Sequence, residues 1–240
     1  MSGVLNYWKA GLDCVPAEVW EAVPGPRVLI LADNALTALP GRIGELSTLR
    51  TLDLGHNALT RLPASLGDLT GLSGCLYLHD NRLAELPAAL GRLVRLGYLN
   101  VGENPLRRLP DELGGLAGLY ELRAQHCALA GLPPALGRLA RLRELWLRGN
   151  RLTALPGAFV GLRELRELEL RENALAEVPV ALRGLPLLRR LDLRANRIGT
   201  LPHWLPEWPS LEKLDLRWNA VDEAAPELRA LRDRGCVVLV

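Results

Sequence analysis

The sequence predicts an α/β fold of the solenoid type: a right-handed, horseshoe-like coil with a parallel sheet on its concave face and short α or 3₁₀ turns on its convex face. Two observations predict it. The first is a unit, LRELWLRGNRLTALP at residues 142–156, whose leucines and asparagine recur along nearly the whole chain. The second is the spacing of the asparagine position, which advances by 23 residues at every step except one step of 24. The nine positions are Asn34, Asn57, Asn81, Asn104, Cys127, Asn150, Asn173, Asn196 and Asn219.

Composition and charge exclude several classes of protein. Hydrophobic residues make up 49% of the 240 residues and the formal net charge is +2, which indicates a folded chain with no general attraction to nucleic acid or acidic membranes. Four cysteines without paired spacing argue against a disulfide framework. The first residues lack the pattern of a secretory signal, and no apolar run is long enough to span a membrane. We therefore expect a cytoplasmic monomer.

Residues 1–25 are predicted to be an N-terminal cap. Leu12, Val15 and Val19 match the second half of the following repeat, so we expect half a repeat without its strand. A terminal repeat has one face without a neighbour. Trp8 and Trp20 are expected to cover that apolar face.

Residues 26–221 are predicted to hold nine repeats. The L-x-L segment of each repeat alternates between apolar and polar residues and predicts a short strand, for example at residues 144–147. The segment after the asparagine, for example residues 62–69, combines a proline at the first helical position, helically spaced leucines and an internal glycine, which predicts a short α or 3₁₀ turn. Stacked repeats bury their leucines against one another, at roughly 1.5–3 kcal/mol per leucine before the entropy cost. Because the helical side is bulkier, we expect the sheet on the inside of the curve.

The recurring asparagine is expected in a buried turn, where its amide donates to and accepts from the backbone of adjacent turns. Cys127 replaces it once and interrupts this ladder. We interpret its thiol as inert packing, and a reactive thiol is the alternative. The one extra residue of the array falls at Ser73–Gly74, before a strand at residues 76–78. A loop extension without function and a bulge that re-aims side chains both remain open for it.

Residues 222–240 are predicted to be a C-terminal cap. Residues 226–234 begin with proline and precede Gly235, which predicts a helix. Residues 236–240, CVVLV, predict a short strand that pairs with the edge of the last repeat.

The pattern L-x-x-L-x-L-x-x-N-x-L-x-x-L-P-x-x-L-G-x-L resembles the leucine-rich repeat family, and specifically the 23-residue class found in intracellular Ras-pathway scaffolds and in bacterial proteins. The match covers nearly the whole chain. The resemblance implies a horseshoe fold and the binding of partner proteins on the concave sheet.

The outward-facing strand positions predict where a partner binds. The middle of the sheet collects aromatic side chains and arginine, which are typical anchors of protein interfaces. Cross-strand packing of a solvated face is the alternative interpretation. The predicted partner-binding residues are Tyr77, His79, Tyr98, Tyr120, Arg123, His126, Trp146 and Arg148.

The C-terminal strands carry a column of arginines beside a column of acids. We expect these charges to compensate one another as solvated salt bridges, each of little energetic value. An arginine ladder that meets an acidic partner is the alternative. The arginines are Arg148, Arg171, Arg194 and Arg217, and the acids are Glu169, Asp192 and Asp215.

No pattern in the sequence predicts catalysis or metal binding. Cys75 and His79 lie four residues apart on a strand, about 13 Å, which is too far to share a zinc ion. The serines have no histidine beside them in the repeat frame. We predict a non-enzymatic interaction scaffold without metal or cofactor, which binds an unidentified protein partner and neither nucleic acid nor membrane. The alternative is a regulatory or effector module that acts on a signalling enzyme such as a small GTPase.

Overall fold

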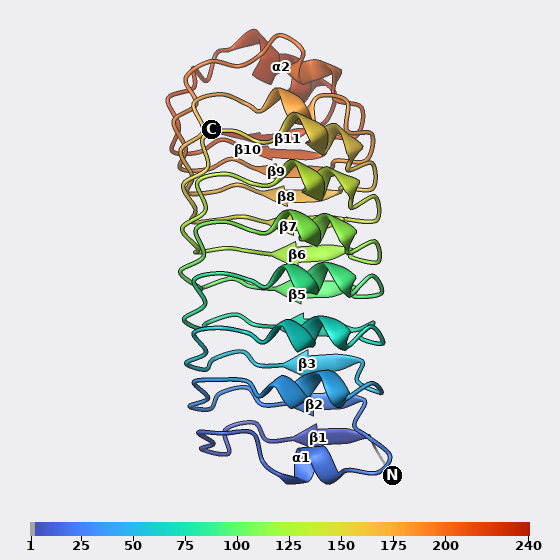
Figure 1. Ribbon diagram of the computed structural model, residues 1–240. Coiled ribbons are helices and arrows are strands. Elements are labelled where there is room, and N and C mark those ends of the chain that lie inside the picture. The colour runs from blue at the N-terminus through green and yellow to red at the C-terminus, as the bar shows by residue number, and fades with distance from the viewer. Residues whose placement is uncertain (1–2) are drawn as a thin grey trace.

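The computed structural model describes residues 3–240 as one coil of stacked repeats (Figure 1), and Met1 and Ser2 lie outside the described residues. The strands form a single parallel sheet in the order β1 to β11, so each strand pairs with its neighbours in the chain. This confirms the predicted solenoid. The strands are β1 Val4–Asn6, β2 Val28–Ile30, β3 Thr51–Asp53, β4 Cys75–Tyr77, β5 Tyr98–Asn100, β6 Glu121–Arg123, β7 Glu144–Trp146, β8 Glu167–Glu169, β9 Arg190–Asp192, β10 Lys213–Asp215 and β11 Val237–Leu239.

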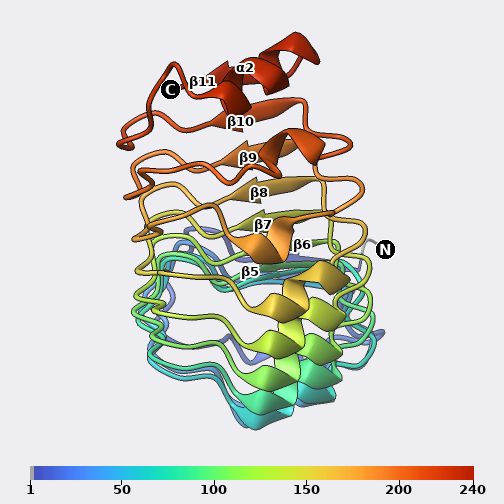
Figure 2. The same ribbon diagram turned by 90° about the horizontal axis from the view of Figure 1, so that it is seen from above.

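Short helices line the side of the coil opposite the sheet (Figure 2). The two α-helices lie near the ends of the chain, and the turns between them are 3₁₀ helices. The proline was predicted at the first helical position, but it lies one residue earlier, as Pro63 does before η2. The helices are α1 Glu18–Glu21, η1 Gly41–Glu45, η2 Ala64–Asp68, η3 Ala88–Arg92, η4 Asp111–Gly115, η5 Pro134–Arg138, η6 Gly157–Gly161, η7 Val180–Leu182, η8 Leu205–Glu207 and α2 Pro226–Asp233.

Glycines allow successive 3₁₀ helices to approach one another closely. A Cβ atom placed on Gly137 of η5 would lie 2.2 Å from the carbonyl oxygen of Ala158 in η6. A Cβ atom on Gly91 of η3 would lie 2.2 Å from the carbonyl oxygen of Glu112 in η4. Both distances are far shorter than a van der Waals contact, so a side chain fits only if the backbone moves. The recurring Leu-Gly pair is therefore a packing feature of the convex side.

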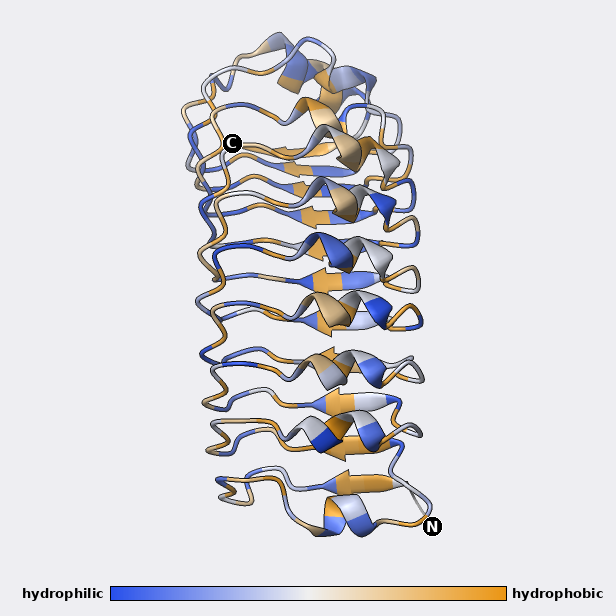
Figure 3. Ribbon diagram, in the orientation of Figure 1, coloured by the Kyte–Doolittle hydropathy of each residue, from blue (hydrophilic) through white to orange (hydrophobic). Residues whose placement is uncertain are grey.

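Leucines fill the interior between the sheet and the 3₁₀ helices. In the repeat at residues 142–156, Leu142, Leu145 and Leu147 are each no more than 1% exposed. Figure 3 shows the apolar positions of successive strands following one another up the stack. Because each leucine packs against those of the next repeat, the coil has one continuous core instead of separate small ones.

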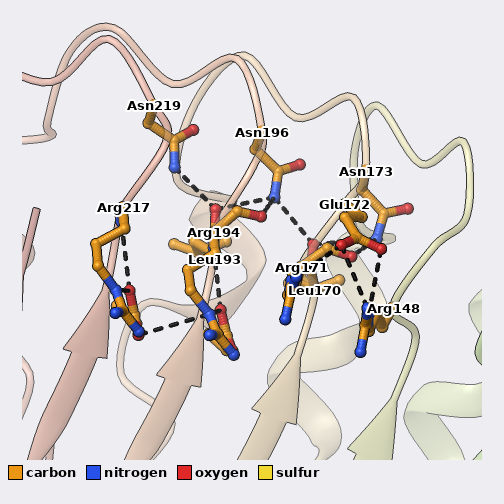
Figure 4. Close-up of polar contacts among 12 residues, drawn as sticks. Arg148, Leu170, Arg171, Glu172, Asn173, Leu193, Arg194, Asn196, Arg217 and Asn219 are labelled. Carbon is orange, nitrogen blue, oxygen red and sulfur yellow. Dashed lines mark hydrogen bonds and ion pairs between the residues drawn. The ribbon is translucent and has the colours of Figure 1, made fainter.

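The asparagine ladder forms as predicted. Asn150 accepts the backbone N–H of Leu129 at 3.1 Å, and its amide nitrogen donates to the carbonyl oxygens of Ala124 at 2.8 Å and Leu147 at 2.9 Å. Each asparagine thus links its own turn to the turn before it. Figure 4 shows Asn173, Asn196 and Asn219 with the carbonyl oxygens of Leu170 and Leu193, to which their amide nitrogens donate.

Cys127 interrupts this ladder. Its sulfur lies 3.6 Å from the carbonyl oxygen of Val101 and 3.5 Å from that of Gln125. No acceptor meets the backbone N–H of Leu106 among the hydrogen bonds of residues 3–240, although the preceding repeats supply one at this point. Burial raises the pKa of the Cys127 thiol to about 11, which favours inert packing over reactivity.

The N-terminal segment differs from the prediction in two ways. It contains a strand, because Val4, Leu5 and Asn6 pair in register with β2. A single inward leucine, Leu5, replaces the usual L-x-L pair, and the sequence pattern therefore did not reveal the strand. Trp20 packs against the core as expected. Trp8 does not: it is 56% exposed and donates to Asp33 from the indole nitrogen at 2.5 Å.

The C-terminal segment agrees with the prediction. Helix α2 ends two residues before Gly235, which has the positive φ of 85° that favours glycine at such a position. Strand β11 then pairs with β10 along its full length. The helix and the strand cover the last repeat.

The extra residue at Ser73–Gly74 is absorbed before β4. The N–H of Gly74 donates to the carbonyl oxygen of Arg50 at 2.8 Å, and that of Cys75 turns to the Thr51 hydroxyl at 3.4 Å. Regular pairing resumes at Leu76, so the strand keeps its register and its side chains keep their directions. This arrangement favours the loop extension over the re-aiming bulge.

Two further features concern the chain as a whole. Over residues 3–240, no helix is both long and apolar enough to cross a lipid bilayer. Cys14, Cys75, Cys127 and Cys236 are all free thiols.

Candidate functional site

Five predicted residues meet at the centre of the concave face, and we call them the central cluster: Tyr77, His79, Tyr98, Arg123 and Trp146. The rings of Tyr77 and Tyr98 lie 5.0 Å apart on adjacent strands, and His79 lies edge-on to Tyr77 at 6.1 Å. The guanidinium of Arg123 lies 5.8 Å from the ring centre of Tyr98 and 5.0 Å from that of Trp146. The cluster is therefore a continuous stack across β4 to β7.

Neighbouring residues hold the two polar members of the central cluster in place. Glu121 accepts from Arg123 Nε at 2.6 Å, which fixes the guanidinium between the two rings. His79 lies over Gly55, where a Cβ atom would come within 2.4 Å of the imidazole. Burial, followed by the nearby His56, lowers the pKa of His79, so the imidazole is neutral at pH 7.

The structure does not bring the other three predicted residues into the central cluster. Tyr120 precedes β6 and lies on the flank of the coil, over Gly97. His126 sits at the turn after β6. Arg148 pairs with Glu172 at 3.2 Å. Spacing in the repeat did predict which strands are neighbours, but Tyr120 and His126 lie outside the outward strand positions.

The position before each asparagine, and before Ala10 and Cys127 at the equivalent points of their repeats, forms a second surface that the sequence analysis did not recognise as a group. Its residues have φ between 50° and 61° although most are not glycine, a conformation that costs roughly 1 kcal/mol or more per residue. Most of these side chains are exposed. The frequent Asp and His residues there were a usable signal, because these types tolerate positive φ. The non-glycine residues are Lys9, Asp33, His56, Asp80, Glu103, His126, Glu172, Ala195 and Trp218.

The arginine column of the C-terminal strands is compensated, as predicted, but the pairs around Asp215 are partly buried and not solvated as expected. Arg194 pairs with Asp192 and lies 3.5 Å from Asp215, and Arg217 Nη2 donates to Asp215 at 2.7 Å (Figure 4). Glu172 accepts from the two preceding arginines of the column. The column therefore offers little free positive charge to an acidic partner.

Asp215 is the most buried carboxylate of this zone, at 3% exposure. Burial alone would raise its pKa, but the hydrogen bonds from Arg217 and the nearby Arg194 outweigh burial, so the pKa of Asp215 is lowered. A lowered pKa in the folded state adds stability that is present above the unfolded value, about 3.9, and is lost as the pH falls through the folded value.

We expect Asp215→Asn to reduce the urea midpoint of unfolding at pH 7, because the amide cannot pair with both guanidinium groups. The difference from wild type should shrink below about pH 4, where Asp215 begins to be protonated in the unfolded chain, and it should be largely lost only below the lower pKa of the folded state. Glu223→Gln is the matched control, since Glu223 is exposed and makes no ion pair in the described structure. A difference that stays constant from pH 7 to acid would contradict the role of charge.

A hollow of about 230 Å³ adjoins the central cluster between Trp146 and the acidic column. Glu169 lies directly opposite Trp146 on β8 and has no ion pair among the described residues. Burial and the neighbouring Asp192 raise the pKa of Glu169, and nearby arginines offset only part of this effect. The indole nitrogen of Trp146 is buried without a hydrogen-bond partner. The hollow therefore holds a carboxylate without an ion-pair partner and an indole N–H without a hydrogen-bond acceptor.

The residues that the structure describes contain no group of three or more His, Cys, Asp or Glu side chains that could hold a metal ion. The geometry instead offers a rigid sheet with an aromatic and arginine centre. Such a surface is suited to recognition by contact.

Comparisons with known proteins support the repeat assignment. Leucine-rich repeat models match residues 132–175, 48–69 and 187–208. A leucine-rich repeat protein of Leptospira interrogans is similar in structure, with a TM-score of 0.89 and 29% identity over 98% of this chain and 65% of that one. No curated protein sequence matches the chain.

Two plant receptors solved in complex with a partner are also similar. The ectodomain of the Arabidopsis thaliana receptor kinase GASSHO1/SCHENGEN3, in complex with CASPARIAN STRIP INTEGRITY FACTOR 2, has a TM-score of 0.76 and 30% identity over 91% of this chain and 27% of that one. The peptide hormone receptor RGFR1, in complex with RGF2, has a TM-score of 0.72 and 27% identity over 94% of this chain and 41% of that one. The chain thus spans less than two thirds of the length of each of these three structures.

Proposed function

We propose that this leucine-rich repeat protein is a binding scaffold that holds a protein or peptide partner on its concave face, centred on the central cluster. The observation that carries the proposal is the stack of Tyr77, Tyr98, Arg123 and Trp146 across four adjacent strands. Tyrosine, tryptophan and arginine dominate the binding energy of many interfaces, and here the sheet holds them rigid before any partner arrives. The two similar receptors, each solved in complex with a partner and one of them named a peptide hormone receptor, support the same use of this fold.

The hollow beside the central cluster supports a partner that presents a basic side chain. Four carboxylates and three basic side chains line the hollow, and two of the basic side chains already pair with carboxylates of the lining. An arginine or lysine entering it would meet the unpaired carboxylate of Glu169 beside Trp146. It would also neutralise a partly buried charge, which is costly without a partner. The compensated arginine column makes an acidic partner the weaker choice for this face.

The proposal is tested by selecting peptides from a random display library against the full chain and measuring their affinities. Replacing Tyr77, Tyr98 and Trp146 together by alanine should weaken the selected peptides by at least about 30-fold, since hot-spot side chains contribute about 2 kcal/mol or more each. Trp8→Ala is the matched control, because Trp8 is an exposed aromatic outside the central cluster. Circular dichroism checks that the variants fold.

Two results would reject this centre. One is a set of peptides whose affinity survives the triple alanine variant. The other is an equal loss of peptide affinity in the Trp8→Ala variant, which would indicate nonspecific aromatic contact.

The reducing, cytoplasmic setting, the monomeric state and the absence of catalysis remain predictions. The four free thiols are compatible with a reducing setting.

A further inference from the structure

A second hollow, of about 520 Å³, lies on the flank of the coil where the chain enters β5 to β7. Arg95, Arg141, Arg143 and Tyr120 line it, together with Ser73. It is separate from the concave surface of the central cluster and shares no lining residue with the hollow beside Trp146.

Local departures from the repeat create this flank hollow. Gly118 occupies the position between Arg95 and Arg141 in successive repeats, so the floor there is bare backbone. Gly97 allows the Tyr120 ring to lie flat across the flank, since a Cβ atom at Gly97 would be 2.5 Å from Tyr120 Cε1. Ser73, from the one inserted stretch of the array, adds a hydroxyl to the lining.

The flank hollow carries uncompensated positive charge. Arg95, Arg141 and Arg143 are exposed, none of them makes an ion pair within residues 3–240, and no carboxylate lines the hollow. Farther along the same flank, Arg166 lies 4.0 Å from Glu164, and Arg189 lies 3.6 Å from Glu212. By contrast, the flank hollow brings together three arginines without an ion pair.

Arg143 also borders a neighbouring hollow, which Glu144 lines together with Arg166 and Arg190. Glu144 makes no ion pair with Arg143 among the described residues, and it does not line the flank hollow. The flank hollow thus combines three guanidinium groups with the hydroxyls of Tyr120 and Ser73, and all of these can donate hydrogen bonds.

We propose that the flank hollow binds a phosphate monoester carried on a side chain of a protein partner. A phosphate monoester presents three acceptor oxygens and nearly two negative charges at pH 7, so it can pair with several guanidinium groups at once. A carboxylate has two oxygens and one charge, and it would leave part of the site unpaired.

The surroundings favour a protein source over a membrane. Tyr120 and Arg143 directly precede β6 and β7, so a segment lying along the edge of the sheet reaches the hollow. A flat anionic bilayer would instead meet Glu164 and Glu212, which lie on the same flank. Because these carboxylates already pair with Arg166 and Arg189, this part of the flank adds no free positive charge to a broad lipid contact.

The test is calorimetric titration of the full chain with O-phospho-L-serine and with inorganic phosphate at pH 7.5. We expect saturable binding that weakens at least about 10-fold in the double variant Arg141→Gln/Arg143→Gln, as expected when charge-assisted hydrogen bonds are lost. The matched control is Arg138→Gln in η5, because Arg138 is exposed, lies in the same repeat and makes no ion pair in the described chain. Tyr120→Phe keeps the ring, and it should weaken binding less.

Several outcomes would overturn the proposal. The first is that the wild type shows no saturable binding of phosphoserine up to about 10 mM. The second is that Arg138→Gln loses as much affinity for phosphoserine as the double variant. The third is that the protein binds phosphatidylcholine vesicles containing a phosphatidylinositol phosphate more tightly than it binds a phosphoserine peptide. The variant with alanine at Tyr77, Tyr98 and Trp146 should bind phosphoserine as the wild type does. Failure of the concave site and failure of the flank site are therefore distinguishable.

Discussion

Gly137→Ala is expected to lower the free energy of unfolding by about 3 kcal/mol, the upper end of what overpacking costs in a well-packed interior. The added methyl group would lie 2.2 Å from the carbonyl oxygen of Ala158 and 2.7 Å from its carbonyl carbon. These are backbone atoms of the next 3₁₀ helix, so no rotamer change can relieve the clash. Each repeat contacts only its neighbours, and separating η5 from η6 therefore weakens one interface that the whole array needs.

Gly157→Ala provides the control for this prediction. Gly157 begins η6, in the coil next to Gly137, and a Cβ atom there meets nothing within 4 Å. The substitution should be neutral or stabilise by up to about 0.5 kcal/mol, because alanine restricts the unfolded chain. Urea unfolding followed by circular dichroism measures both variants. Equal midpoints for the two would contradict the close approach of the helices as the reason for the glycine.

The repeat architecture could be predicted from the sequence alone, because the same contact between leucines of adjacent repeats recurs along the chain. Each leucine at an L-x-L position has a counterpart one repeat away, and Leu122, Leu145 and Leu168 do face one another in register. The asparagine ladder followed from the same periodicity. A pattern of this length leaves few alternative folds, and the structure confirms the solenoid.

The repeat frame was less informative where the chain departs from it. β1 carries one inward leucine and lacks the asparagine, so only the structure reveals it. The close spacing of the 3₁₀ helices, which gives Gly137 its role, depends on distances that a spacing rule does not contain.

The candidate site was predicted in part for the same reason. Strand pairing follows from the period, so Tyr77, Tyr98 and Trp146 could be placed on one face. Tyr120 belongs to the approach to its strand, and the direction of its ring is set by the absence of a side chain at Gly97. The roles of all these residues in binding remain predictions.

Asn104→Ala is expected to destabilise the protein by about 3 kcal/mol. Asn104 is 3% exposed, accepts the N–H of Leu83 at 2.9 Å and donates to the carbonyl oxygens of Leu78 at 2.9 Å and Val101 at 3.0 Å. Alanine would leave these three backbone groups without their side-chain partner in the interior. An unpaired buried polar group costs about 1–3 kcal/mol. Because the two carbonyl oxygens can retain other contacts, we expect the total cost of losing all three bonds to be about 3 kcal/mol.

Cys127 makes the comparison decisive, because it occupies the same position one repeat later and already lacks these bonds. Cys127→Ala should cost less than about 1 kcal/mol, since it removes only weak contacts of a sulfur atom. Cys127→Asn should instead stabilise by about 1 kcal/mol, because its amide oxygen can reach the N–H of Leu106, which has no acceptor within residues 3–240. Chemical denaturation of the three variants measures these differences. If Asn104→Ala and Cys127→Ala cost the same, the ladder contributes no more than side-chain packing, and its continuity through the stack has no energetic role.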